Sequence, residues 1–564
     1  MAVAEPQRTR SGPTHEVLNQ APPLEPYNVF EQDRPLVEAL HREGAGWAEA
    51  QVSAVGGIAG GEAVEWGRQA NENPPKLRTH DRYGHRIDEV EFHPAWHKLM
   101  DVAVSHGLHS LPWTEERPGG HVARAAAFVT MGQAEGGHLC PISMTYSGVP
   151  ALRATPALAD EWEPRLTSTS YDPRLVNAAD KSGALCGMAM TEKQGGSDVR
   201  ANMTVARPLN GGGPAGEYEI TGHKWFCSAP MCDAFLVLAQ ADGGLSCFLL
   251  PRILPDGTRN RFHLQRLKDK LGNRSNASSE VEFDGAWAQM VGEEGRGVPT
   301  IIEMVNHTRL DCVLGSASGM RLGVARATHQ TAHRSAFGKL LIDQPLMQNV
   351  LADLCIESEA ATVTAMRLAR AYDQSADEES ADSERETLLR RLATAVSKYW
   401  ICKRGPVHAV EALECFGGNG FVEESGMPRM YREAPLNSIW EGSGNVICLD
   451  VLRAMVKSPE SVQIFFDEIE ETAPASPEVA ESVRKLKTEL SDFENIEPRA
   501  RAVVERMALT LQGALLVRDG DPAVADAFCA SRLGGDWGRA FGTLPAGVDV
   551  KRIIARHTPQ PAHA

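Results

Sequence analysis

The sequence predicts an α+β protein that is mostly helical, and two observations carry this prediction. Residues 31–187 and 295–564 have mainly helical character, whereas residues 188–294 hold short strand-forming runs separated by turn clusters. Helices and strands that occupy separate stretches of a chain indicate an α+β fold and not a doubly wound sheet. At 564 residues, the chain is long enough for several domains with large cores.

The first predicted domain covers residues 1–187. Its first 30 residues or so are rich in proline and polar residues, which predicts an extended arm. The remainder is expected to be helical. Residues 93–97, His-Pro-Ala-Trp-His, predict a helix start, because proline is favoured near the first helical position.

The second predicted domain, residues 188–294, is expected to be an antiparallel β domain. Runs of strand-forming residues occur at 203–207, 218–226, 235–240, 246–250 and 280–283. Glycine-rich turns at 210–216 and 241–244 separate some of these runs, as in β-hairpins.

Two further helical domains are predicted, a bundle at 295–455 and an extra domain at 456–564. Between Asp373 and Glu386 lie seven carboxylates and one arginine, which predicts a solvated loop between two long helices. Ser476-Pro477-Glu478 predicts a helix start, after which Val479, Val483, Leu486 and Leu490 fall on one face.

Composition narrows the possible functions. A net charge of −17 argues against a protein that is basic overall, although a local basic patch remains compatible with it. Eleven cysteines without a Cys-x-x-Cys pair indicate reduced, mostly buried thiols, so we expect a cytoplasmic protein. No apolar run is long enough to span a bilayer, and we expect no membrane association.

A glycine turn and a strand face stand out where helix gives way to strand. Residues 189–198 hold Thr191, Gly195, Gly196 and Ser197, whose backbone N–H groups and hydroxyls suit a planar, anionic cofactor. Phe226 and Ser228 alternate along the following strand, so they share a face. Taken alone, each feature also fits a plain polar turn or a core aromatic beside a solvated serine.

Three later segments add to these. Residues 334–339 (Arg-Ser-Ala-Phe-Gly-Lys) and 414–421 (Glu-Cys-Phe-Gly-Gly-Asn-Gly-Phe) suit a pyrophosphate and a nucleotide base, but lack the strand–turn–helix setting of a dinucleotide-binding fingerprint. Residues 439–445 place Glu441 beside Ile439 and Trp440. Burial there would raise the pKa of the Glu441 carboxyl toward the range of a general base.

Together, these blocks resemble the acyl-CoA dehydrogenase family in order and spacing, over about residues 90–455. Within it, residues 92–97, 190–198, 266–278 and 437–445, and the extra C-terminal helices, are most similar to the AidB-type alkylation-response flavoproteins. The resemblance implies FAD between the β domain and the C-terminal helices, a homotetramer, and an external electron acceptor.

The resemblance also assigns site residues. It implies Glu441 as the catalytic base, because Thr308, at the position that carries the base in other branches, cannot serve. It implies Arg309 on the substrate side. Phe226 stands where many relatives have tryptophan, and Glu414 replaces a common glutamine, so that nucleotide contact is doubtful. The implied FAD contacts are Met188, Ala189, Met190, Thr191, Gly195, Gly196, Ser197, Phe226, Cys227, Ser228, Arg334, Phe337, Ile439, Trp440, Gly442, Ser443 and Asn445. Of these, Arg334 and Phe337 are implied to reach the adenine half of FAD in a neighbouring subunit.

Two function hypotheses follow. The first is an enzyme of low activity that dehydrogenates an acyl thioester and takes part in the response to DNA alkylation. The second is a protective or regulatory flavoprotein that binds double-stranded DNA, with vestigial dehydrogenase activity. Residues 491–564 hold nine Lys/Arg and nine Asp/Glu, so DNA binding would need arginines gathered on one face, and the candidates are Arg499, Arg501, Arg506 and Arg532.

A metal site is not expected. His93 and His97 have the i, i+4 spacing of zinc ligands, but no glutamate follows His93 and no third ligand is evident in the sequence.

Overall fold

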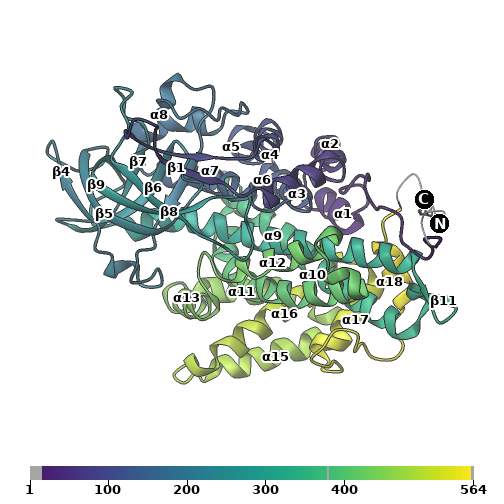
Figure 1. The fold of residues 1–564 in the computed structure, drawn as a ribbon. Helices are drawn as coiled ribbons and strands as arrows, with labels where there is room; N and C mark the ends of the chain where they lie inside the picture. Colours follow the sequence, from purple (N-terminus) through teal and green to yellow (C-terminus); the bar gives the residue numbers. More distant parts are fainter. Residues whose placement is uncertain (1–14, 378–379, 561–564) are drawn as a thin grey trace, which may run out of the picture.

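The computed structural model describes residues 15–377 and 380–560. Figure 1 shows the β domain at one end of the molecule and a layered set of helices at the other. The first 14 residues of the predicted arm lie outside the described residues. The mostly helical α+β class is confirmed.

Helices dominate the N-terminal part of the chain. They are α1 (Arg34–Arg42), α2 (Glu49–Ala59), α3 (Glu62–Glu72), α4 (Pro94–Ser105), α5 (Leu111–Thr114), α6 (Gly120–Gly132), α7 (Leu139–Leu152) and α8 (Pro156–Leu166). The predicted start of α4 is confirmed, since His93 is the N-cap residue and its Nδ1 accepts from Ala95 N at 3.2 Å. A hairpin of β1 (Lys76–His80) and β2 (Arg86–Glu91) interrupts the helices and was not predicted.

The β domain is one twisted sheet. Its strands are β3 (Cys186–Ala189), β4 (Val205–Pro208), β5 (Glu217–Ser228), β6 (Ala234–Ala241), β7 (Gly244–Pro251), β8 (Phe262–Leu267) and β9 (Ser278–Val291). The strand order is β3-β6-β4-β5-β9-β7, with β8 paired to β9.

Each of the five predicted strand runs overlaps one of these strands. The sheet is mainly antiparallel, as predicted, but β6 pairs in parallel with both β3 and β4, which the sequence did not predict. Long connections separate these strands along the chain, and such crossovers are what parallel pairing requires.

Three long helices form the centre of the helical part: α9 (Gly297–His333), α10 (Pro345–Ala376) and α11 (Ser383–Glu414). They pack on one another and are followed by α12 (Met427–Glu433) and α13 (Gly444–Lys457). A short hairpin of β10 (Ser335–Ala336) and β11 (Lys339–Leu340) projects beyond the end of α9 (Figure 1).

The acidic loop is shorter than the sequence suggests, because α10 continues to Ala376 and α11 begins at Ser383. The first and last of its carboxylates contact other parts of the protein. Asp373 Oδ1 accepts from His121 N at 2.8 Å, and buried Glu386 pairs with Arg367 at 2.8 Å. Glu378 and Glu379 lie outside the described residues.

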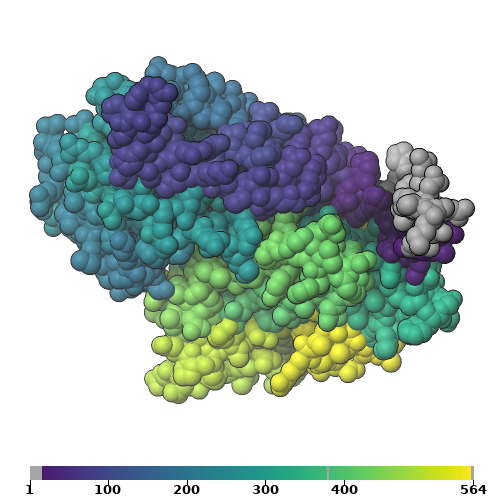
Figure 2. Space-filling view, viewed as in Figure 1, coloured from purple at the N-terminus to yellow at the C-terminus, as the bar shows by residue number. Residues whose placement is uncertain are grey.

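The C-terminal segment adds α14 (Pro459–Glu470), α15 (Pro477–Ser491), α16 (Ala500–Asp519), α17 (Pro522–Phe528) and α18 (Val550–His557). Ser476 caps α15 as predicted, and Val479, Val483 and Leu486 are buried. In Figure 2 this yellow segment lies against the green helices. Its apolar side chains belong to the same buried cluster as those of α9–α11, so it completes that core.

Ion pairs reinforce this junction. Arg367 of α10 lies 2.8 Å from Glu386 of α11 and 2.8 Å from Glu468 of α14, with all three side chains buried. Breaking a buried pair leaves an uncompensated charge, so this network couples α14 to the two long helices.

All eleven cysteines lie within the described residues, and each is buried and unpaired, as predicted. In the described part of the chain, no helix combines the length and apolar character needed to cross a membrane.

Candidate active site

The glycine turn after β3 has a backbone that only small residues permit. Gly195 has φ +130°, and a Cβ on Gly196 would lie 2.4 Å from Thr191 Oγ1. The carbonyl of Thr191 accepts from Trp225 N at 2.8 Å, which ties the turn to β5. The turn is therefore a fixed, open loop with Ser197 exposed.

A buried ion pair anchors the same turn from below. Lys224 Nζ lies 2.9 Å from Glu192 Oε1, and both side chains are 0% exposed. The Glu192 carboxylate also accepts from Met203 N and Thr204 N, at 2.7 and 3.1 Å. It thus joins both ends of the turn to β5.

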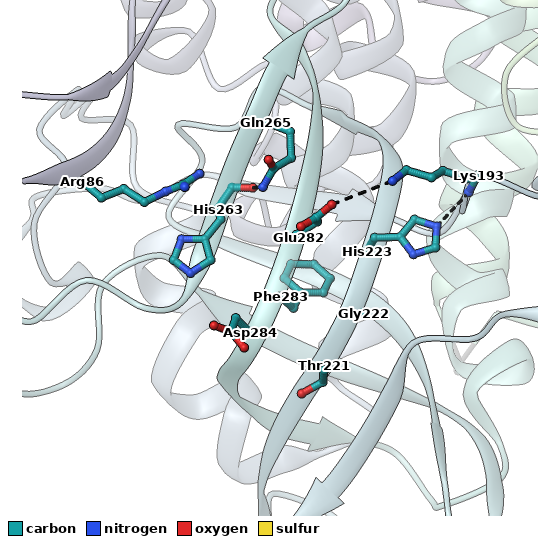
Figure 3. Close-up of a pocket in the computed structure, with 10 residues that line it drawn as sticks. All are labelled: Arg86, Lys193, Thr221, Gly222, His223, His263, Gln265, Glu282, Phe283 and Asp284. Atoms are coloured by element: carbon teal, nitrogen blue, oxygen red, sulfur yellow. Dashed lines mark hydrogen bonds and ion pairs between the residues drawn. The ribbon is translucent and has the colours of Figure 1, made fainter.

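A groove on the outer face of the sheet adds a third anchor. Figure 3 shows Lys193 of the turn beside His223 and Glu282, across β5 and β9. Lys193 N donates to His223 Nε2 at 3.0 Å, and its Nζ lies 3.8 Å from Glu282. These two contacts fix the outer edge of the turn beside the groove, whose volume is about 510 Å³.

The predicted face on β5 is present. Cys227 is 0% exposed and points into the sheet core, whereas Phe226 is 50% exposed and Ser228 is half-buried. Lys268 Nζ lies 4.7 Å from the centre of the Phe226 ring. The predicted contact of Cys227 with a cofactor is thus limited to its backbone, because its thiol faces away.

Glu441 precedes α13 in a constrained backbone. Its φ is +58°, a region that few non-glycine residues occupy. Lys398 Nζ donates to the carbonyls of Trp440 and Gly442, at 2.8 and 2.5 Å, and Arg309 Nε donates to the Glu441 carbonyl at 3.1 Å. We call Lys398 and Arg309 the carbonyl clamp, because they hold three consecutive carbonyls.

The Glu441 side chain is poised to accept a proton. Burial raises the pKa of its carboxyl, and Thr308, Arg309 and Lys398 oppose that rise. Among the described residues, its Oε2 has no hydrogen-bond partner. Arg309 also pairs with Asp450 at 2.7 Å, which reduces its influence on Glu441.

Cys140, at the start of α7, links the β domain to Glu441. Burial raises the pKa of its thiol to about 11, with smaller effects from the charges of Lys270 and Glu441 and from hydrogen bonding with Ser228 and Asn276. Cys140 is therefore close to Ser228 and within electrostatic range of Glu441.

Two further groups of predicted FAD residues lie next to Glu441 and to the glycine turn. Ile439 is exposed and Trp440 is half-buried; after Glu441, Gly442 leads to Ser443, the N-cap of α13, and Asn445 lies in its first turn. Met188, Ala189 and Met190 form the end of β3 and its exit, directly before the turn.

Within one chain, Arg334 and Phe337 do not lie near Glu441 or the glycine turn. They flank β10 on the hairpin at the opposite end of the molecule from β5 (Figure 1). Phe337 is 100% exposed, and Arg334 Nη1 donates to Asn19 O at 2.9 Å. Glu414, at the end of α11, is also exposed.

Each of the four C-terminal arginines has a partner within the protein. Arg532 was predicted to meet phosphate from a loop, and this is wrong, because its side chain is 0% exposed and pairs with Asp353 and Glu357. Arg499 pairs with Asp492, Arg501 donates to the Tyr399 hydroxyl, and Arg506 pairs with Glu489.

The two histidines of α4 have separate partners. His93 caps the helix, and His97 Nδ1 lies 2.9 Å from the Tyr171 hydroxyl. Within the described ranges, no three His, Cys, Asp or Glu side chains are grouped to hold a metal ion.

Sequence reasoning missed Lys398, Glu192, Lys224 and Lys270. Lys398 alone stands in a run of apolar or small residues, Ala-Val-Ser-Lys-Tyr-Trp-Ile, and because lysine is almost never fully buried without a partner, such a position carries a signal for a buried polar contact. Each of the other three has a polar or charged neighbour in the sequence and carries no such signal.

Comparison with known proteins agrees with this geometry. Family models match residues 19–173 (adaptive response protein AidB, N-terminal domain), 187–286 (acyl-CoA dehydrogenase, middle domain) and 295–456 (acyl-CoA dehydrogenase, C-terminal domain). The chain is 45% identical over 523 residues to AidB of Escherichia coli K12, which is named as an acyl-CoA dehydrogenase. The match covers 92% of this chain and 94% of that protein. The chain belongs to the acyl-CoA dehydrogenase family, in its AidB branch.

Two further comparisons come from Caenorhabditis elegans. Acyl-CoA dehydrogenase family member 11 is 30% identical over 518 residues, covering 86% of this chain and 82% of that protein. The crystal structure of ACDH-11 in complex with C11-CoA matches with a TM-score of 0.85 at 27% identity, over 98% of this chain and 99% of that one. Acyl-CoA dehydrogenases are FAD-dependent flavoproteins, and this chain is a member of that oxidoreductase family.

The buried pair below the turn generates a prediction. Replacing Lys224 with Met leaves the Glu192 carboxylate buried without its cation, which should cost about 3–5 kcal/mol of folding stability. We expect a lower urea midpoint and weaker FAD retention, measured by denaturation and by flavin absorbance after gel filtration.

The double variant Lys224→Met, Glu192→Gln removes both charges and should lose less stability than Lys224→Met alone. The exposed Lys76→Met serves as the control. Equal losses in the single and double variants would show that the pair does not anchor the turn.

Proposed function

We propose that the protein dehydrogenates an acyl-CoA thioester with Glu441 as the base. The observation that carries this proposal is Glu441, whose backbone the carbonyl clamp holds and whose carboxyl group has an unpartnered oxygen and a raised pKa. The ACDH-11 complex with C11-CoA supports the substrate class.

The residues of the β domain fit FAD. The open glycine turn offers backbone N–H groups and the Thr191 and Ser197 hydroxyls, and Phe226 and Ser228 present a flat aromatic face beside a hydroxyl. We assign the isoalloxazine side to Met188, Met190, Thr191, Phe226 and Ser228, and further contacts to Ser197, Trp440, Ser443 and Asn445. Bound FAD would supply the acceptor for the hydride that leaves the β-carbon of the substrate.

Glu441 performs the proton step. Its carboxylate takes the α-proton, the C–H electron pair forms the new α,β double bond, and the β-hydrogen leaves with its electron pair. The electrons then pass to an external acceptor. The clamp contributes to the rate because it holds the backbone of Glu441 in one geometry before the reaction.

For Arg309 we propose a role other than the predicted substrate contact. Its side chain is 7% exposed, pairs with Asp450, and donates to the Glu441 carbonyl. We therefore assign it to positioning the base.

A base substitution tests the mechanism. Glu441→Gln should keep FAD bound but reduce the rate of flavin reduction by acyl-CoA about 10²–10⁴-fold, because the amide cannot take the α-proton. Anaerobic mixing with a panel of acyl-CoAs measures this rate.

In the wild type, only the deprotonated carboxylate acts as a base. The rate should therefore rise as pH increases through the raised pKa of Glu441. Wild-type-like reduction of Glu441→Gln would place the base elsewhere. We expect a low rate even in the wild type, in keeping with the AidB branch.

Assembly is the second part of the proposal. A single chain separates Arg334 and Phe337 from the glycine turn by the length of the molecule, and Phe337 is fully exposed (Figure 1). Leu346 and Phe421 are also 84% and 86% exposed. These features support a homotetramer, a dimer of dimers, in which the hairpin of one subunit reaches the FAD of another.

Phe337→Asp should therefore weaken assembly and release FAD on dilution, as followed by sedimentation velocity at flavin wavelengths. Tyr83→Asp, at an exposed aromatic on the β1–β2 turn, should change neither. A Phe337→Asp monomer that keeps its FAD at high dilution would contradict the shared site.

The alternative role is double-stranded DNA binding as part of an alkylation response. Its support is membership of the AidB branch, because residues 19–173 match the N-terminal domain of the adaptive response protein AidB. With Arg532 excluded, the candidates are Arg499, Arg501 and Arg506. Eleven unpaired thiols support a reducing compartment, and we propose the cytoplasm.

Deleting α14–α18 would expose the core that these helices complete, so duplex binding is better tested by substitution. Replacing Arg499, Arg501 and Arg506 together with Gln should weaken sequence-tolerant duplex binding. The slope of log K against log salt concentration should become shallower by about three, one for each lost charge. Fluorescence anisotropy measures both. Yellow wild-type protein without duplex binding at low salt would leave the enzyme role alone.

A further inference from the structure

The loop between β8 and β9 places a lysine behind Ser228. Lys270 Nζ donates to Asn276 O at 2.8 Å and to Ser278 Oγ at 3.0 Å. Ser278 of β9 is the register partner of Ser228 of β5, and their Oγ atoms lie 3.2 Å apart. Three side chains from two strands and a loop thus form one hydrogen-bonded chain.

This chain has a direction. A lysine ammonium only donates, so Ser278 Oγ accepts from Lys270. The Ser278 hydrogen is then free to donate to Ser228 Oγ. Ser228 also meets the Cys140 thiol, which is protonated and can itself donate. Ser228 can therefore direct its own hydrogen toward a group on the open face of β5, the face it shares with Phe226.

We infer that Lys270 is a positioning residue that, through Ser278, orients the Ser228 hydroxyl as a donor toward the flavin and places a positive charge behind it. This inference rests on the proposed function, in which Ser228 faces the flavin. A nearby cation stabilises a ring that gains negative charge on reduction, so Lys270 raises the flavin's reduction potential.

The surroundings of Lys270 set the pH range of this effect. Cys140 of α7, Glu433 of α12 and Glu135 of the α6–α7 connection face it. Burial lowers the pKa of Lys270 to about 8, and burial raises the pKa of Glu433 to about 7. Lys270 is charged below its pKa and neutral above it, so its influence on the flavin should fade as pH rises through that value.

The experiment compares the FAD-loaded variants Lys270→Met, Lys270→Arg and Ser278→Ala. The remote, exposed Lys551→Met is the control for net charge. Reduction potentials are measured against redox dyes from pH 6 to 10. Affinity for sulfite, which adds to the flavin ring and rises with its potential, is measured by absorbance.

Lys270→Met should have a more negative potential and about tenfold weaker sulfite binding, in line with loss of one nearby charge. Lys270→Arg should restore most of both, and Ser278→Ala should move both in the same direction as Lys270→Met. Lys551→Met should match the wild type. Above the pKa of Lys270 the wild type should converge on Lys270→Met, whereas Lys270→Arg should not.

Three results would overturn the inference in FAD-loaded protein. One is an unchanged potential and sulfite affinity in Lys270→Met or, if that variant does not fold, in Ser278→Ala. Another is failure of Lys270→Arg to restore the potential. The third is loss of the pH dependence in Glu433→Gln, which would assign the titration to Glu433. A wild type that cannot bind FAD would instead overturn the proposed function itself.

Discussion

The carbonyl clamp is the constraint on which the candidate active site depends. Three consecutive carbonyls, those of Trp440, Glu441 and Gly442, are held by two buried cations from different helices, Lys398 of α11 and Arg309 of α9. A left-handed backbone at Glu441 is unfavourable alone and persists only where its surroundings fix it. The clamp supplies that fixation and so sets the position from which the Glu441 side chain projects.

The clamp in turn depends on the packing of the long helices. Lys398 lies on α11, and its position depends on the packing of α11 against α9, α10, α13 and α16. The C-terminal helices complete that core, and the buried Arg367–Glu386–Glu468 network ties α14 to α10 and α11. The segment from α14 onward therefore has a structural role, whatever it binds.

The β domain applies the same principle on the opposite wall. The glycine turn has little apolar surface of its own, so its shape depends on the Lys224–Glu192 pair beneath it and on Lys193 and His223 at its edge. The Lys270–Ser278–Ser228 chain extends this pattern. Both walls of the site are thus held by buried lysines that donate to oxygen atoms, and each lysine comes from an element other than the one it fixes.

The sequence by itself determined the class of fold, the β domain between helices, the glycine turn, the Phe226–Ser228 face and Glu441. These are local features: strand alternation, the conformational freedom of glycine and helix capping act within a few residues. Only the tertiary structure showed that Arg532 is buried, that Arg334 and Phe337 lie far from the turn in one chain, and that Lys398, Lys224 and Lys270 position the site. These properties depend on contacts between residues tens to hundreds of positions apart, such as Arg532 with Asp353, and no local pattern encodes which distant carboxylate or carbonyl a buried cation will meet.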